Sequence, residues 1–122
     1  MTQVAEIPVT SPITATGATG PLLADSNAGE LVVSITVSAV SGTDPSCTFT
    51  AQWAEQGTGY SDPSYDTGGA VSASALTEAG TATISLPANI NDSGEPSTWW
   101  QLKWTVSGTT PSFTVSAATA TG

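Results

Sequence analysis

The chain is nearly devoid of basic residues and of cysteine. Its 122 residues include no histidine, no arginine, one lysine (Lys103) and one cysteine (Cys47), against ten acidic residues, so the formal net charge at pH 7 is -9. A nucleic-acid-binding surface needs clustered Lys and Arg to displace counterions from phosphates, and anionic membranes attract basic segments in the same way. We therefore expect neither nucleic acid nor a membrane surface as a partner.

The missing histidine also limits the chemistry that is available. Ser–His–Asp and Cys–His catalytic sites cannot be built, and a structural zinc site needs more Cys or His ligands than the chain has. Two carboxylate pairs remain for acid–base work, Asp62 with Asp66 and Asp92 with Glu95. Their segments, "SDPSYD" and "NINDSGE", could offer oxygen ligands to calcium but lack EF-hand spacing. Acidic residues in such Gly/Pro/Ser loops usually solvate a turn, so we predict no enzyme, no metal and no cofactor.

Long hydrophobic runs are missing as well. No apolar run approaches the ~20 residues of a membrane-spanning helix, and the start "MTQVAEIPVT" lacks the basic and apolar regions of a signal peptide. The length suits one domain. Three prolines in residues 1–24, namely Pro8, Pro12 and Pro21, favour an extended N-terminal arm. We therefore divide the chain into an arm, 1–24, and a β domain, 25–122.

What the sequence does contain is alternation of apolar and polar residues with a period of two, which is typical of half-buried strands. No window shows a convincing helical period. The side chains expected to point inward are Leu31, Val33, Ile35, Val37, Ala39, Cys47, Phe49, Ala51, Trp53, Ala82, Ile84, Leu86, Trp100, Leu102, Trp104, Val106, Phe113 and Val115. Several short strands separated by Gly, Pro, Ser and Asp predict an all-β, antiparallel β-sandwich, either immunoglobulin-like or jelly-roll.

One phrase occurs twice, as "VSGTDPS" at Val40–Ser46 and as "VSGTTPS" at Val106–Ser112. Each copy joins two alternating runs. Gly42 and Gly108 could take the positive φ of a tight connection, and the proline of each copy would direct the chain into the next strand. We predict that each phrase is a hairpin connection, with the two hairpins related by internal pseudo-symmetry.

The four tryptophans allow two interpretations. On a β-sandwich they could form the flat aromatic platform of a carbohydrate-binding module, in which Trp99 would lie beside Tyr60 or Tyr65. Strand parity instead assigns Trp53, Trp100 and Trp104 to the core and leaves Trp99 outward, as at a subunit interface. The core or interface interpretation is the favoured one.

Three stretches together resemble a known family. They are "VSAVSGTDPSCTFTAQWAEQG", "TEAGTATISLP" and "WWQLKWTVSGTTPSFTVSA". In this order they resemble small β-sandwich virion structural proteins, of the capsid-decoration kind, from tailed phages that infect actinobacteria. The likeness covers about residues 29–118. It departs from the family pattern in the loop "AEQGTGYSDPSYD" and in "WWQLKW", which keeps only one basic residue.

The resemblance implies a bacteriophage virion protein that decorates the outer capsid surface and clamps neighbouring capsomers. The implied partners are the major capsid protein and further copies of the chain, in a homo-oligomer for which a trimer is favoured. A tail or head–tail component is the first alternative, and a carbohydrate-binding module is the second. The residues expected at interfaces, chosen by their position, are Ile7, Val9, Ile13, Leu22, Leu23 and Trp99.

Overall fold

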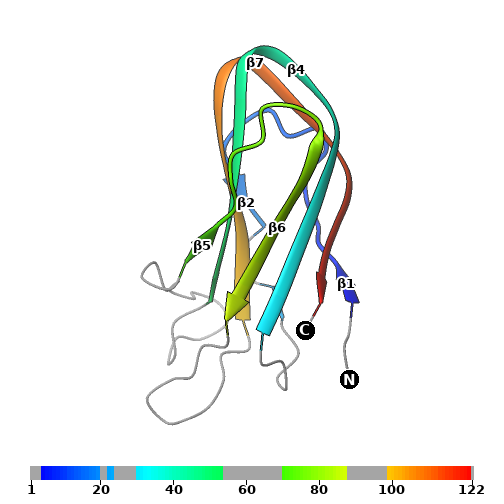
Figure 1. Cartoon of the computed structure of the whole chain (residues 1–122), viewed down its shortest axis with the longest axis vertical. Helices are drawn as coiled ribbons and strands as arrows, with labels where there is room; N and C mark the ends of the chain where they lie inside the picture. Colours follow the sequence, from blue (N-terminus) through cyan, green and yellow to red (C-terminus); the bar gives the residue numbers. More distant parts are fainter. Residues whose placement is uncertain (1–3, 20–21, 24–29, 54–69, 88–98, 122) are drawn as a thin grey trace.

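The computed structural model describes residues 4–19, 22–23, 30–53, 70–87 and 99–121, and this part of the chain is all-β with no helix (Figure 1). The strands are β1 (Val4–Glu6), β2 (Gly17–Ala18), β3 (Leu22–Leu23), β4 (Glu30–Trp53), β5 (Val71–Ser72), β6 (Gly80–Pro87) and β7 (Trp99–Thr121). Every pairing between them is antiparallel, and all belong to one sheet. The predicted all-β, antiparallel class is therefore confirmed.

Two very long strands organise this sheet. β4 has 24 residues and β7 has 23, and they pair with each other from Val32 opposite Thr121 to Trp53 opposite Trp100. β6 lies on the first half of β4 and β5 on its second half, while β1, β2 and β3 line the other side of β7. Figure 1 shows β4 and β7 bending together at one end of the molecule, so that the sheet curls over itself.

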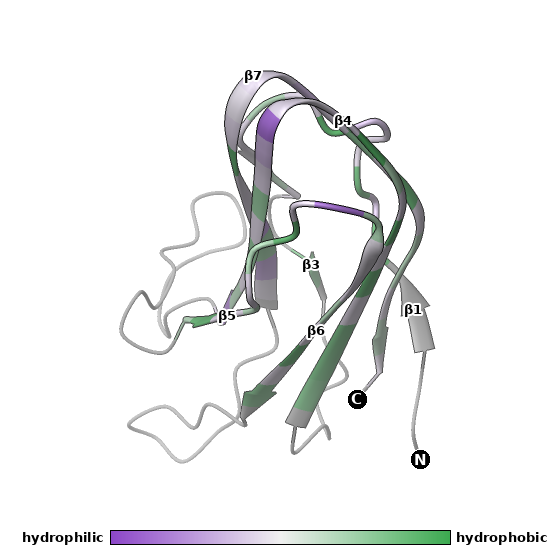
Figure 2. Ribbon diagram, turned by 45° about the horizontal axis from the view of Figure 1, so that its top comes forward, coloured by the Kyte–Doolittle hydropathy of each residue, from purple (hydrophilic) through white to green (hydrophobic). Residues whose placement is uncertain are grey.

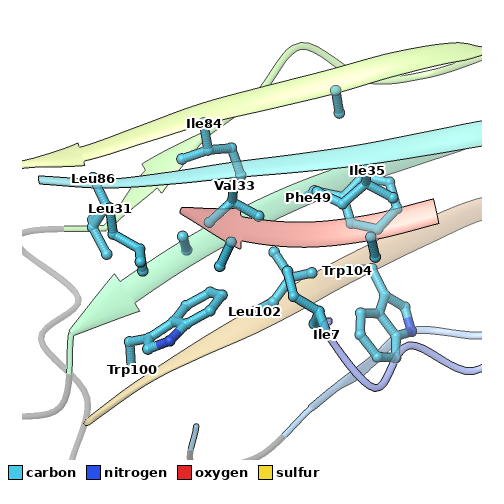
Figure 3. Packing of buried hydrophobic residues seen from close by; sticks show 14 of the residues in the cluster. Ile7, Leu31, Val33, Ile35, Phe49, Ile84, Leu86, Trp100, Leu102 and Trp104 are labelled. Atoms are coloured by element: carbon cyan, nitrogen blue, oxygen red, sulfur yellow. The ribbon is translucent and has the colours of Figure 1, made fainter. Parts of the chain in front are cut away.

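The curled sheet encloses one apolar cluster. Side chains from both halves of the sheet meet there, among them Val33 and Ile35 from one half and Phe49 and Leu102 from the other (Figure 3). Bands of hydrophobic residues along β4 and β6 are visible in Figure 2. The predicted inward positions that are buried are Leu31, Val33, Ile35, Val37, Cys47, Phe49, Ala51, Trp53, Ala82, Ile84, Leu86, Trp100, Leu102, Trp104 and Phe113, while Val106 and Val115 pack against the cluster half-buried.

The alternation fails at Ala39, which is exposed rather than inward. The pairing runs from Val37 opposite Val115 directly to Ala39 opposite Thr114, so Ser38 is an extra residue in β4. Ser116 is likewise extra in β7, because Thr36 faces Ala117 and Val37 faces Val115. Each extra residue is a β-bulge that shifts the parity of its strand by one. A period-two pattern cannot locate such an insertion.

The hairpin prediction for the repeated phrase is wrong. Both copies lie inside the long strands, Val40–Ser46 within β4 and Val106–Ser112 within β7, and the two copies pair with each other. Each phrase is thus a bend in a continuous strand, with register shifts between Ser41 and Thr43 and between Thr43 and Ser46. The chain does not reverse here; it turns the corner of the curled sheet.

The two bends are related by a local pseudo-two-fold. Val40, which begins the first phrase, faces Phe113, the residue after the second; Val106, which begins the second, faces Cys47, the residue after the first. Thr43 and Thr109, the same position in both copies, face each other at the centre. The sequence repeat therefore encodes one symmetric corner built from two strands.

Candidate interaction surface

The N-terminal segment, meaning residues 4–19 and 22–23, lies along the side of β7 that does not face β4. It pairs there through β1, β2 and β3 and through an isolated bridge between Ile13 and Phe113. Ile13 N–H donates to the Phe113 carbonyl at 2.8 Å, and Phe113 N–H donates back to the Ile13 carbonyl at 2.9 Å. The residues predicted as an extended arm thus include three short strands at the edge of the sheet.

Four of the residues expected at an interface pack on the chain's own core. Ile13 is 1 % exposed and Ile7 is 6 % exposed, and both belong to the buried cluster. Val9 and Leu22 are half-buried and pack against that cluster. The backbones of Leu23 and Trp99 pair with each other, while their side chains lie outside the described part of the structure. The structure therefore brings the side chains of Ile7, Val9, Ile13 and Leu22 onto the apolar cluster, and Ile7 and Ile13 are part of the core.

Two hydroxyl groups take the place of missing backbone partners along this edge. The Ser11 hydroxyl accepts from Val115 N–H at 3.1 Å and lies 3.4 Å from the Val115 carbonyl, to which it donates. The Thr16 hydroxyl accepts from Val106 N–H at 2.9 Å and lies 3.5 Å from the Val106 carbonyl. Pro12, which lies between them in the sequence, has no N–H to donate to the ladder. Sequence patterns did not identify Ser11 or Thr16, because Ser and Thr are common at exposed positions of any strand.

Each tryptophan whose side chain the structure describes lies on the face that the alternating pattern predicts. Trp53, Trp100 and Trp104 are buried, which confirms their assignment to the core and removes them from any sugar platform. Figure 3 shows Trp100 directed into the cluster, whereas the Trp104 indole lies at its margin, next to Gly17 of the N-terminal segment. Tyr60, Tyr65 and the side chain of Trp99 lie outside the described residues, so a smaller platform built from them stays a prediction.

A polar pair is buried on the opposite face of the sheet from this cluster. Gln52 and Gln101 face each other across β4 and β7, are 3 % and 8 % exposed, and share a 2.7 Å hydrogen bond from the Gln101 amide N–H to the Gln52 side-chain oxygen. The alternation leaves both residues off the inward face, and it gives no sign that their side chains are buried on the other face. The bond partly offsets the desolvation of both amides.

The single thiol is buried, as expected for a small core residue. Cys47 is fully buried on β4, and burial raises the pKa of its thiol to about 11. A neutral thiol is a poor nucleophile. Among the described residues no group of His, Cys, Asp and Glu could hold a metal ion. Both predicted carboxylate pairs and both candidate calcium segments lie outside them.

Among the described residues, no helix is long and apolar enough to span a membrane. No family model, no curated protein and no solved structure matches this chain.

Proposed function

We propose that the chain is a structural virion protein of a tailed bacteriophage that decorates the outer capsid surface as a homo-oligomer. The observation that supports the proposal most is where the three family-like stretches lie. They fall on β4, β6 and β7, of which β4 pairs with both of the others, and the repeated phrase within them forms one symmetric corner. Stretches far apart in the sequence thus occupy a single structural unit, as expected if they are inherited together.

We also propose that the domain is a β-sandwich that carries an N-terminal arm. The two halves of the curled sheet share one core, and this arrangement supports a β-sandwich. The N-terminal arm would contribute to assembly through residues that its own chain leaves uncovered. Runs of exposed positions separate the two buried residues of this segment from its other parts, and they include Thr10, Ser11, Thr14 and Ala15. We assign contacts with the major capsid protein to these positions, and not to the buried Ile7 and Ile13.

The copy number per particle tests this function. We expect quantitative mass spectrometry of purified particles to find the chain at a simple symmetric ratio to the major capsid protein, since decoration follows the symmetry of the shell. A handful of copies per particle would instead support the tail or head–tail alternative. Absence from every particle would overturn the virion assignment and leave the carbohydrate-binding module, which glycan-array binding dependent on Trp99 would then test.

A further inference from the structure

We propose that the side of β7 that does not face β4 is a strand-acceptor site, and that the N-terminal segment of a second copy of this chain occupies it in the homo-oligomer. The inference deepens the homo-oligomer part of the proposed function, on which it rests. In the described structure the segment's strands pair with β7 and with no other strand. A segment held by one neighbouring strand can be exchanged between copies with all of those pairings preserved, which is the usual route to a domain-swapped oligomer.

The acceptor site is specific for a strand of this sequence. Phe113 offers its N–H and carbonyl to the residue at position 13, whose isoleucine side chain is seated in the core. Val115 and Val106 each offer an N–H and a carbonyl to a hydroxyl, at positions 11 and 16. Backbone pairing provides affinity and the seated side chains provide selectivity, as in other cases of strand addition. A second copy carries an identical segment and meets every one of these requirements.

Charge also favours this occupant. The chain carries a net charge of -9, so most contacts between copies bring like charges together. Residues 7–23 contain no charged side chain, and the only charged residue of β7 is the cation Lys103. Lys103 lies opposite Ala18, and both are exposed. Contact between residues 7–23 and β7 of another copy therefore brings no like charges together.

The attachment of the segment is discontinuous, which suits exchange. β1 has three residues and β2 and β3 have two each, with a single bridge at Ile13 between the first two. Pro8 and Pro12 have no N–H to donate to the ladder. Short pairings can open one after another, whereas a continuous ladder of the same length would have to open as a unit.

Disulfide trapping in the full-length protein tests the exchange. Thr19 N–H donates to the Leu102 carbonyl, and because hydrogen-bonded and non-hydrogen-bonded pairs alternate, Ala18 and Lys103 form a non-hydrogen-bonded pair. Such pairs are close enough for a disulfide. A18C and K103C chains are unfolded together, refolded as a mixture and mildly oxidised. The buried Cys47 does not compete while the chain is folded.

Two controls accompany the mixture. The double variant A18C/K103C should close within one chain and thus verifies the register. A mixture of A18C with T83C, an exposed β6 position not paired with the segment, measures random coupling. We expect the A18C and K103C mixture to give at least threefold more heterodimer than this control, increasing with protein concentration.

Heterodimer at the control level, with the double variant closed, would overturn the exchange. Failure of the double variant to close would overturn the acceptor register and the proposal with it. Neither result bears on particle copy number, so the proposed function and the exchange can fail separately.

Discussion

At the scale of single residues, Gly42 and Gly108 shape the symmetric corner. Their φ angles are +113° and +110°, a region that other L-residues rarely adopt. A Cβ at Gly42 would lie 2.7 Å from the Thr110 carbonyl oxygen, and a Cβ at Gly108 would lie 2.6 Å from that of Asp44. The obstruction is backbone in both cases, so the corner itself would have to move.

We predict that Gly42→Ala and Gly108→Ala each lower the free energy of unfolding by about 2–4 kcal/mol, through backbone strain and overpacking. Gly80→Ala is the matched control, because its Cβ would meet only Leu76 Cδ2 at 3.7 Å; its effect should be within about 1 kcal/mol of zero. Urea unfolding measures all three. Equal losses in Gly42→Ala and Gly80→Ala would contradict the described corner.

The equivalent positions Asp44 and Thr110 give a second prediction. Both have positive φ, 50° and 48°, and a β-branched residue tolerates this region less well than Asp or Asn. Thr110→Asn should therefore raise the free energy of unfolding by about 0.5–1 kcal/mol, and Asp44→Thr should lower it by a similar amount. Opposite signs in denaturant unfolding are the expected result; destabilisation by both would show that the two bends are not equivalent.

Cys47 provides a prediction on reactivity and pH. Its thiol pKa is about 11 in the folded chain, against 9.0 for an ordinary thiol, because burial disfavours the thiolate. A thiol reagent at pH 8 should modify Cys47 only after denaturant is added. The pKa of this thiol is higher in the folded chain than in the unfolded chain. The contribution of the neutral, buried thiol to the free energy of unfolding is therefore complete below pH 9 and is lost as the pH rises toward 11. Rapid labelling of the native protein would contradict the burial of this side chain.

At the scale of elements, the N-terminal segment contributes to the fold through Ile13. Ile13→Ala removes a side chain that is 1 % exposed and packs in the core, so we expect a loss of about 2–5 kcal/mol. Val9→Ala, in the same segment but half-buried, should lower the free energy of unfolding by less than about 1.5 kcal/mol. Thermal or urea unfolding distinguishes them, and a small effect of Ile13→Ala would mean that the segment leaves β7 readily without loss of the core.

At the scale of the whole molecule, the net charge of -9 governs encounters between copies. Raising ionic strength from 0.01 to 0.15 M shortens the Debye length from about 30 to about 8 Å. Self-association measured by sedimentation should therefore strengthen with salt. Lys103→Gln, which raises the magnitude of the net charge by one, should make this salt dependence slightly steeper. Association that weakens with salt would indicate intermolecular ion pairs, which a chain with one lysine and no arginine is poorly equipped to form.

The sequence alone determined the fold class and most of the core, because a period-two pattern reports directly which strand residues face inward. It identified Val33, Phe49 and Trp104 as core residues, and all three are buried. It also indicated that the repeated phrase is structural. These are local properties, determined by the alternation of side chains along an extended backbone.

Only the tertiary structure decided which strands pair and where the chain turns. "VSGTDPS" has the residues of a hairpin turn, but a bend in a continuous strand needs the same positive φ at Gly42, so local chemistry does not distinguish them. The choice depends on pairing with a second bend more than sixty residues away, at Gly108. The seating of Ile13, the bulge at Ser38 and the burial of Gln52 likewise depend on distant partners, which no local period encodes.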